Sequence, residues 1–204
     1  MTELGKVPAF GQADPTDNRD LLDWRSRYSE PEAKRWILIE CIYAASLMTI
    51  LPIAMLVLWL GYPKNWLHLS DQAYRPILKY GLGWLSGVLG GTLFDTKWLY
   101  HSVARQIWHL DRRLWRFFVP HIAGGLAFVI VALISSGLFR IFDPRAVESA
   151  PTIVGVGFLV GYFSDNAIAK LREIADTLFG SSRTEEKHRP KVSESKPEHR
   201  KEEK

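Results

Sequence analysis

Residues 36–60 read WILIECIYAASLMTILPIAMLVLWL, an apolar stretch that a single charged residue, Glu40, interrupts. As an α-helix rising about 1.5 Å per residue, this stretch is long enough to cross the ~30 Å hydrocarbon layer of a membrane. It begins well inside the chain and exceeds the ~7 to 15 residues of a signal-peptide core, so we expect it to remain as an anchor. The chain is therefore predicted to be an integral membrane protein.

Three further apolar stretches follow, at about residues 77–94, 117–139 and 152–168. All four are predicted to be helices, because an open strand cannot satisfy its backbone hydrogen bonds in lipid. Pro120 falls in the first turn of the third stretch, where a lost amide proton costs little. The predicted fold class is all-α: a polytopic membrane protein with four transmembrane helices and cytoplasmic helical extensions, forming one domain over residues 36–180.

The charged residues are concentrated at the two ends of the chain. Overall, 47% of the residues are hydrophobic and 24% are charged, which alone would suit a soluble protein. Residues 1–35 are predicted to be a cytoplasmic N-terminal segment, and residues 181–204 a disordered charged tail that has too few apolar side chains to order itself. Basic cytoplasmic loops explain the sequence pI of about 9.2 better than nucleic-acid binding does.

Basic residues also predict the orientation. The connections at 61–76 and 140–151 hold few of them, whereas the N-terminal segment, the middle connection and the C-terminal segment hold many. Because cytoplasmic loops carry an excess of Lys and Arg, both termini and the middle connection are predicted to be cytoplasmic.

The middle connection has a helical apolar stripe, made of Leu99, Val103, Ile107, Leu110 and Leu114. One interpretation is a cytoplasmic extension of the second and third spans, packed as a helical hairpin. The alternative is a surface helix that senses or perturbs lipid. A second amphipathic stretch continues the fourth span without a break signal, and Gly180 is predicted to cap it.

Glycines recur at spacings of four in the second and fourth spans, which places them on one helix face and permits close helix packing. These predicted helix-packing residues are Gly83, Gly87, Gly91, Gly157 and Gly161.

Four titratable groups are predicted to form one polar layer in the inner leaflet: Glu40, Asp95, His121 and Asp165. Because ionisable groups in a membrane are costly and often functional, a proton or ion relay is one interpretation. The other is structural, with each group close enough to the interface to be hydrated or to pair with a nearby basic residue. The dependence of the cost on depth favours the structural interpretation.

No catalytic motif is evident, so the protein is predicted not to be an enzyme and to need no cofactor. The single cysteine, Cys41, lacks the spaced partners that a zinc site would need, so no metal site is predicted.

Two segments resemble a family of poorly characterised bacterial multipass inner-membrane proteins. Residues 157–180, GFLVGYFSDNAIAKLREIADTLFG, are similar to that family's glycine-rich last span, which ends in Phe-Ser and continues as an amphipathic helix. Residues 110–139 look like its third span. The resemblance implies localisation in a bacterial inner membrane and assigns no catalytic residue.

Two functions fit these features. One is a self-associating membrane effector or pore in a stress or defence response, in which the small-residue faces of the second and fourth spans assemble the protomers. Its partners are the lipid bilayer and further copies of the chain. The alternative is a membrane scaffold or regulatory subunit that docks a cytosolic protein.

Overall fold

The computed structural model describes residues 26, 28–138 and 147–180, and all regular structure in these ranges is helical. The helices are α1 (Pro31–Trp59), α2 (Tyr62–Trp66), α3 (Asp71–Ala104), the short 3-10 helix η1 (Leu110–Arg112), α4 (Arg113–Ser135), α5 (Ala150–Tyr162) and α6 (Ser164–Phe179). The predicted all-α fold class is confirmed. The segments predicted to be a cytoplasmic N-terminus, up to residue 25, and a disordered tail lie outside the described residues.

Two helical segments, Pro31–Trp59 and Leu110–Ser135, are long and apolar enough to cross a membrane. A third is added if α5 and α6, which are separated by a bend, count as one span. The chain is therefore a membrane protein with two or three candidate spanning helices. The predicted second span, residues 77–94, lies inside α3, which is not among them, so the prediction of four spans is not confirmed.

The first helix, α1, is apolar on every side and covered on one. Its buried residues Glu40, Ala44, Leu51 and Met55 follow helical spacing and form a single stripe. Elsewhere the helix is open, and only 17% of its most apolar window is buried. An apolar surface of this size that the chain itself does not cover is typical of a helix in lipid.

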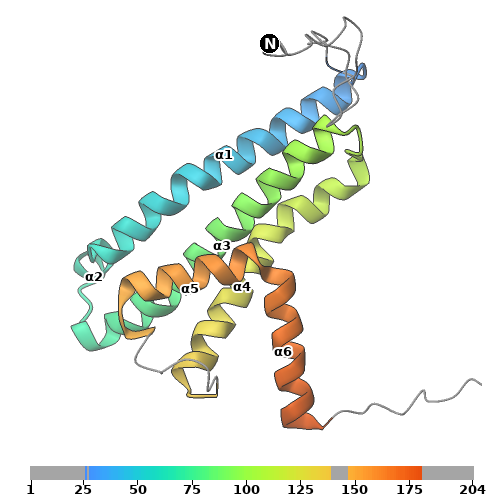
Figure 1. Ribbon diagram of the computed structural model, residues 1–204. Helices are drawn as coiled ribbons and strands as arrows, with labels where there is room; N and C mark the ends of the chain where they lie inside the picture. The colour runs from blue at the N-terminus through green and yellow to red at the C-terminus, as the bar shows by residue number, and fades with distance from the viewer. Residues whose placement is uncertain (1–25, 27, 139–146, 181–204) are drawn as a thin grey trace, which may run out of the picture. The chain divides into compact units, whose positions relative to one another are not determined.

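The chain forms two compact units, residues 1–168 and 169–204. In the first unit α3 is central, because it packs against α1, α4 and α5. Figure 1 shows α1 and α3 side by side in opposite directions, with α4 returning from the far end of α3. The buried face of α3 is rich in small residues, which let its neighbours approach closely: Gly83, Ser86, Gly87, Gly90, Gly91 and Thr92.

The predicted apolar stripe of the middle connection does not lie on one helix. α3 ends at Ala104, and the chain turns at Gln106, whose φ is +59°. η1 and α4 follow, so the two long helices form a hairpin. α4 begins at Arg113, earlier than expected, which moves Pro120 from the predicted first turn into the helix interior.

The predicted fourth span is broken. α5 ends at Tyr162, Phe163 leaves the helical region with φ −107° and ψ 39°, and α6 begins at Ser164. The prediction of a continuous helix through residue 168 was therefore wrong. Ser164 and Asp165 are typical of a helix start, and this local signal was overlooked inside an apolar run.

The second unit is described from residue 169 to residue 180 and contains the end of α6. Lys170 donates to Glu173 at 2.6 Å, one turn along the helix. The helix ends at Phe179, and Gly180 follows with a φ of +73°. This left-handed conformation favours glycine, so the predicted cap at Gly180 is confirmed.

Candidate functional site

Glu40 and Arg116 form a buried ion pair that joins α1 to α4. Arg116 donates through Nε to Glu40 Oε2 at 2.9 Å and through Nη2 to Glu40 Oε1 at 3.0 Å. Trp108, in the turn after α3, donates through Nε1 to the same Oε2 at 2.9 Å. All three residues are buried. A two-point contact between guanidinium and carboxylate is directional, so it fixes how these three segments meet.

Further contacts surround this ion pair. Arg116 Nη2 also donates to the His109 carbonyl oxygen at 3.3 Å, and its guanidinium lies 5.5 Å from the centroid of the Trp108 ring. Its Nη1 has no hydrogen-bond partner within the part of the chain that the structure describes. Arg113 lies 3.9 Å above the ring of Trp36 and gives α1 and α4 a second contact.

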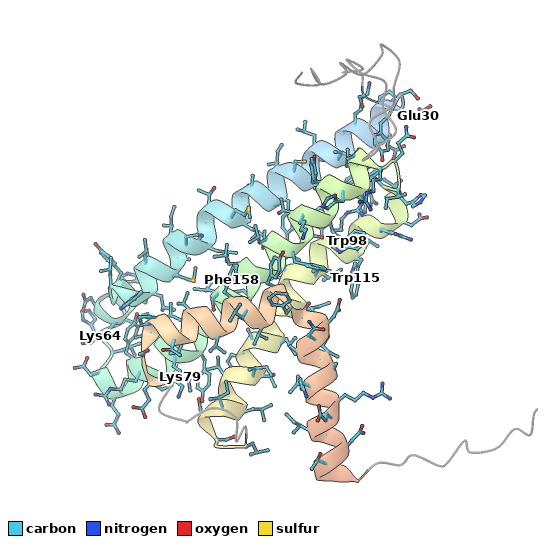
Figure 2. The ribbon with its side chains drawn as sticks, in the orientation of Figure 1. Glu30, Lys64, Lys79, Trp98, Trp115 and Phe158 are labelled. Atoms are coloured by element: carbon cyan, nitrogen blue, oxygen red, sulfur yellow. The ribbon has the colours of Figure 1, made fainter. Side chains whose placement is uncertain are left out.

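Asp95 lies on α3 at the buried side of a cavity of about 310 Å³. Only 8% of this residue is exposed, and its carboxyl group has no ion-pair or hydrogen-bond partner among residues 28–138 and 147–180. Trp98 from α3 and Trp115 from α4 line the same cavity, and both are more than half exposed. Figure 2 labels these two tryptophans on their neighbouring helices.

Asp165 also lines this cavity, from the first turn of α6. It is exposed, so it lies at the open side, whereas Asp95 is buried. Arg116 lines the cavity as well. The cavity thus brings together two members of the predicted polar layer, Asp95 and Asp165, and the arginine that holds a third, Glu40.

His121, the fourth member of the predicted polar layer, lies elsewhere. Its Nε2 is 3.1 Å from the hydroxyl oxygen of Tyr43, and that hydroxyl donates to the Phe117 carbonyl oxygen at 3.1 Å. Because a hydroxyl has one proton to give, His121 Nε2 is the donor to Tyr43. The ring of His121 also stacks on Trp84, with centroids 6.5 Å apart. These contacts tie α4 to α1 and α3, and do not include the cavity.

The glycines of α5 pack on α3 within one chain. A Cβ added to Gly157 would lie 2.7 Å from the Gly83 carbonyl oxygen, and one added to Gly161 would overlap the Gly87 carbonyl oxygen. Real Cβ atoms keep a greater distance, so the α3–α5 contact requires glycine at both positions.

The glycines of α3 are used in the same way against α4. A Cβ at Gly91 would lie 2.5 Å from the Cβ of Ala123, and one at Gly87 would lie 2.9 Å from the Ala123 carbonyl oxygen. A Cβ at Gly83 would meet Val131 at 3.1 Å. The predicted glycine faces therefore make their contacts inside a single copy of the chain, and they are already occupied there, so they do not offer the predicted surface for assembling protomers.

Sequence reasoning missed the partner of Glu40 and the walls of the cavity. Glu40 was expected near a hydrated interface, but it is 3% exposed and its partner Arg116 is remote in sequence. Asp95 was expected to be hydrated or paired, and it is buried beside the cavity without an ion-pair partner in the described ranges. The signals for these features were arginine and tryptophan residues in the middle connection, which the sequence alone assigns to several other roles, such as interfacial anchors.

The site offers buried charge, aromatic walls and a cavity. Within the described ranges, no three His, Cys, Asp or Glu side chains are grouped so that they could hold a metal ion. In comparisons with known families, curated proteins and solved structures, this chain has no match. Its resemblance to a bacterial membrane-protein family thus stays a prediction.

Proposed function

We propose that this chain is an integral protein of the bacterial inner membrane that acts through association of its helices and performs no chemistry of its own. The observation that supports this proposal best is α1, whose apolar surface is mostly uncovered by the rest of the chain. Leu38, Ile42 and Ile53 on its outer side are 57% to 60% exposed. Such a surface is stable only against lipid or against other apolar helices.

In this proposal α3 spans the membrane together with α1 and α4. α3 has 34 residues and packs between those two apolar helices, so a membrane that contains them also contains α3. Its lower hydropathy has a structural cause, since its glycine, serine and threonine residues face other helices. Small residues at such positions are typical of helix contacts in membranes.

α5 is too short to cross alone. Its 13 residues extend about 20 Å as a helix, less than the ~30 Å hydrocarbon layer. It therefore inserts only part of the way, from the side on which α4 ends, and the start of α6 is proposed to complete the crossing, since the two helices together are long and apolar enough to form one broken span. The excess of basic residues before α1 and between α3 and α4 supports cytoplasmic placement of the N-terminus and of that turn. The C-terminus is proposed to be cytoplasmic for the same reason.

The surface that we propose for association is a groove between α1 and α3. It has a volume of about 400 Å³, and small residues of α1, namely Cys41, Ala44 and Ala45, line it beside Leu99 and Val103 of α3. Small residues let a second helix approach closely in lipid, where no hydrophobic force drives helices together. The glycine faces are already used inside the chain, so the groove is the surface proposed to receive α1 of a second copy.

Cys41 provides the test, because it is the only cysteine in the chain and it is exposed. Mild oxidation of membranes that contain the full chain is expected to give a disulfide-linked dimer. In a Cys41→Ala background, Ala45→Cys is expected to cross-link too, and Ile53→Cys on the outer side of α1 is the matched control. A chain that is monomeric in lipid and cross-links at none of these positions would refute self-association.

The alternative function, a scaffold that docks a cytosolic protein, makes a different prediction. A scaffold stays monomeric, recovers a defined partner from the cytosol and leaves the membrane tight when it is overproduced. A self-associating effector or pore gives the dimer described above, and ion leakage that follows cross-linking. Measuring leakage and oligomeric state in the same membranes therefore distinguishes the two functions.

A further inference from the structure

The cavity between α3, α4 and the first turn of α6 combines features that recognise a positively charged organic group. We propose that it binds a small organic cation, whose ammonium group is held by Asp95 and Asp165 between the rings of Trp98 and Trp115. This inference is independent of the proposed self-association, since its groups lie outside the groove between α1 and α3.

The buried carboxyl group of Asp95 supports the proposal first. A buried charge is costly unless a donor or an opposite charge compensates it. Asp95 lines the cavity at its buried side and lacks such a partner in the described ranges. Glu40, by contrast, is satisfied by Arg116 and Trp108. A cationic ligand in the cavity would give Asp95 the partner that the chain does not.

The aromatic walls indicate an organic cation over an inorganic one. Trp98 and Trp115 line the cavity, and tryptophan is the side chain whose ring face attracts ammonium groups most strongly. Sodium, magnesium and calcium ions instead require several oxygen ligands. Five of the side chains that line the cavity are aromatic or aliphatic and offer no oxygen ligand: Phe94, Trp98, Ile107, Trp115 and Val119.

The balance of charge also favours a cation. Two arginines line the cavity, Arg112 and Arg116. The charge of Arg116 is compensated by Glu40, and Arg112 is exposed, where water screens it. Two carboxyl groups, those of Asp95 and Asp165, therefore line the cavity beside one arginine, Arg112, that no carboxylate of the described residues compensates.

The volume of about 310 Å³ lies at the small end of ligand sites, so the ligand is a small amine or the headgroup of a lipid. The two sources share one chemistry, an ammonium group. They differ in whether an acyl chain is needed, and the exposed rings of Trp98 and Trp115 leave the cavity open to either.

The experiment uses the full chain, purified in a non-ionic detergent. Its thermal unfolding midpoint is measured with tetramethylammonium chloride, with ethanolammonium chloride, and with sodium chloride at equal ionic strength. At a hundredfold excess over the dissociation constant, an ammonium salt is expected to raise the midpoint by about 5 to 10 °C relative to sodium. A lipid source is indicated if only phosphatidylethanolamine, and not phosphatidylglycerol, has this effect in nanodiscs.

Variants locate the site. Asp95→Asn is expected to weaken ammonium binding by about tenfold or more, because the charged partner is lost. Trp98→Leu is expected to weaken it by roughly two- to fivefold. Asp111→Asn, on exposed η1 outside the cavity, is the matched control and leaves binding unchanged.

A readout without ligand separates binding from a structural role. Asp95 has no partner to lose, so Asp95→Asn should keep or raise the unfolding midpoint of the empty protein, whereas a structural role predicts a lower one. The proposal is overturned if no ammonium compound stabilises the protein beyond sodium, or if Asp95→Asn binds ammonium as the unaltered chain does. It is also overturned if ammonium binding is absent and Asp95→Asn abolishes proton flux in liposomes, which is the result that a proton relay predicts.

Discussion

Gly157 and Gly155 offer the sharpest test of the bundle, because they receive the same substitution on the same helix. Gly157 is buried, and a Cβ there would lie 2.7 Å from the Gly83 carbonyl oxygen, which already accepts a 3.1 Å hydrogen bond from Ser86 Oγ. Gly155 is exposed, and a Cβ there would meet no atom within 4 Å. The two substitutions therefore add the same methyl group to the same helix and differ only in the atoms that surround it.

The magnitude follows from these contacts. Carbon atoms pack best at about 3.5 to 4.0 Å, so Gly157→Ala must push α5 away from α3 by about 1 Å. Overpacking of this kind costs about 1 to 3 kcal/mol of unfolding free energy. Gly155→Ala has no clash and gains up to about 1 kcal/mol from helix propensity. Gly157→Ala has the same gain in helix propensity, so the two variants should differ by the cost of the clash alone, about 1 to 3 kcal/mol or roughly 5- to 150-fold in the unfolding equilibrium.

The assay is reversible unfolding in mixed micelles of a non-ionic detergent and dodecyl sulfate, followed by far-ultraviolet circular dichroism. Both variants are measured beside the unaltered chain. Equal stability of Gly157→Ala and Gly155→Ala would refute the reasoning, since it would mean that α5 does not rest on α3 through Gly157.

Two further predictions concern the ion pair and the topology. Glu40→Ala and Arg116→Ala should each lower the unfolding free energy by about 3 to 5 kcal/mol in the same assay, because each leaves the other charge buried without a partner. The double variant should lose much less than the sum of the two, and additive losses would contradict the pairing. Reporters fused after Trp36, within residues 62–75, 100–112 and 141–150, and after Gly180 should read in, out, in, out, in, and an external C-terminus would contradict that topology.

The sequence was sufficient for the two helices that are long and apolar enough to cross a membrane. An uninterrupted apolar run predicted α1 within a few residues of its ends, and an apolar run with an aromatic and basic entry predicted α4. In both cases the signal is a property of the helix itself. Gly180, whose positive φ ends α6, was found for the same reason.

The elements that depend on distant neighbours were harder to predict. The break at Phe163 has a weak local signal, the helix start at Ser164 and Asp165, whereas the packing of α5 on α3 through Gly157 and Gly161 has none in the sequence around it. The partner of Glu40 lies on another helix, and nothing in the local spacing around either residue indicates the pairing. Of the four predicted polar groups, the structure brings Asp95 and Asp165 to one cavity, and only the packing of three helices could reveal this.

In the proposed arrangement α3 is a spanning helix whose composition is set by its helix neighbours and not by lipid. A helix that faces lipid must be apolar, but a helix enclosed by α1, α4 and α5 needs small side chains more than apolar ones. The central helix of a membrane bundle is therefore the one whose composition is least typical of a membrane. In the proposed arrangement the same enclosure lets α3 carry Asp95 at a depth where a helix exposed to lipid would not tolerate a carboxylate, so the small residues that permit the packing also permit the polar cavity.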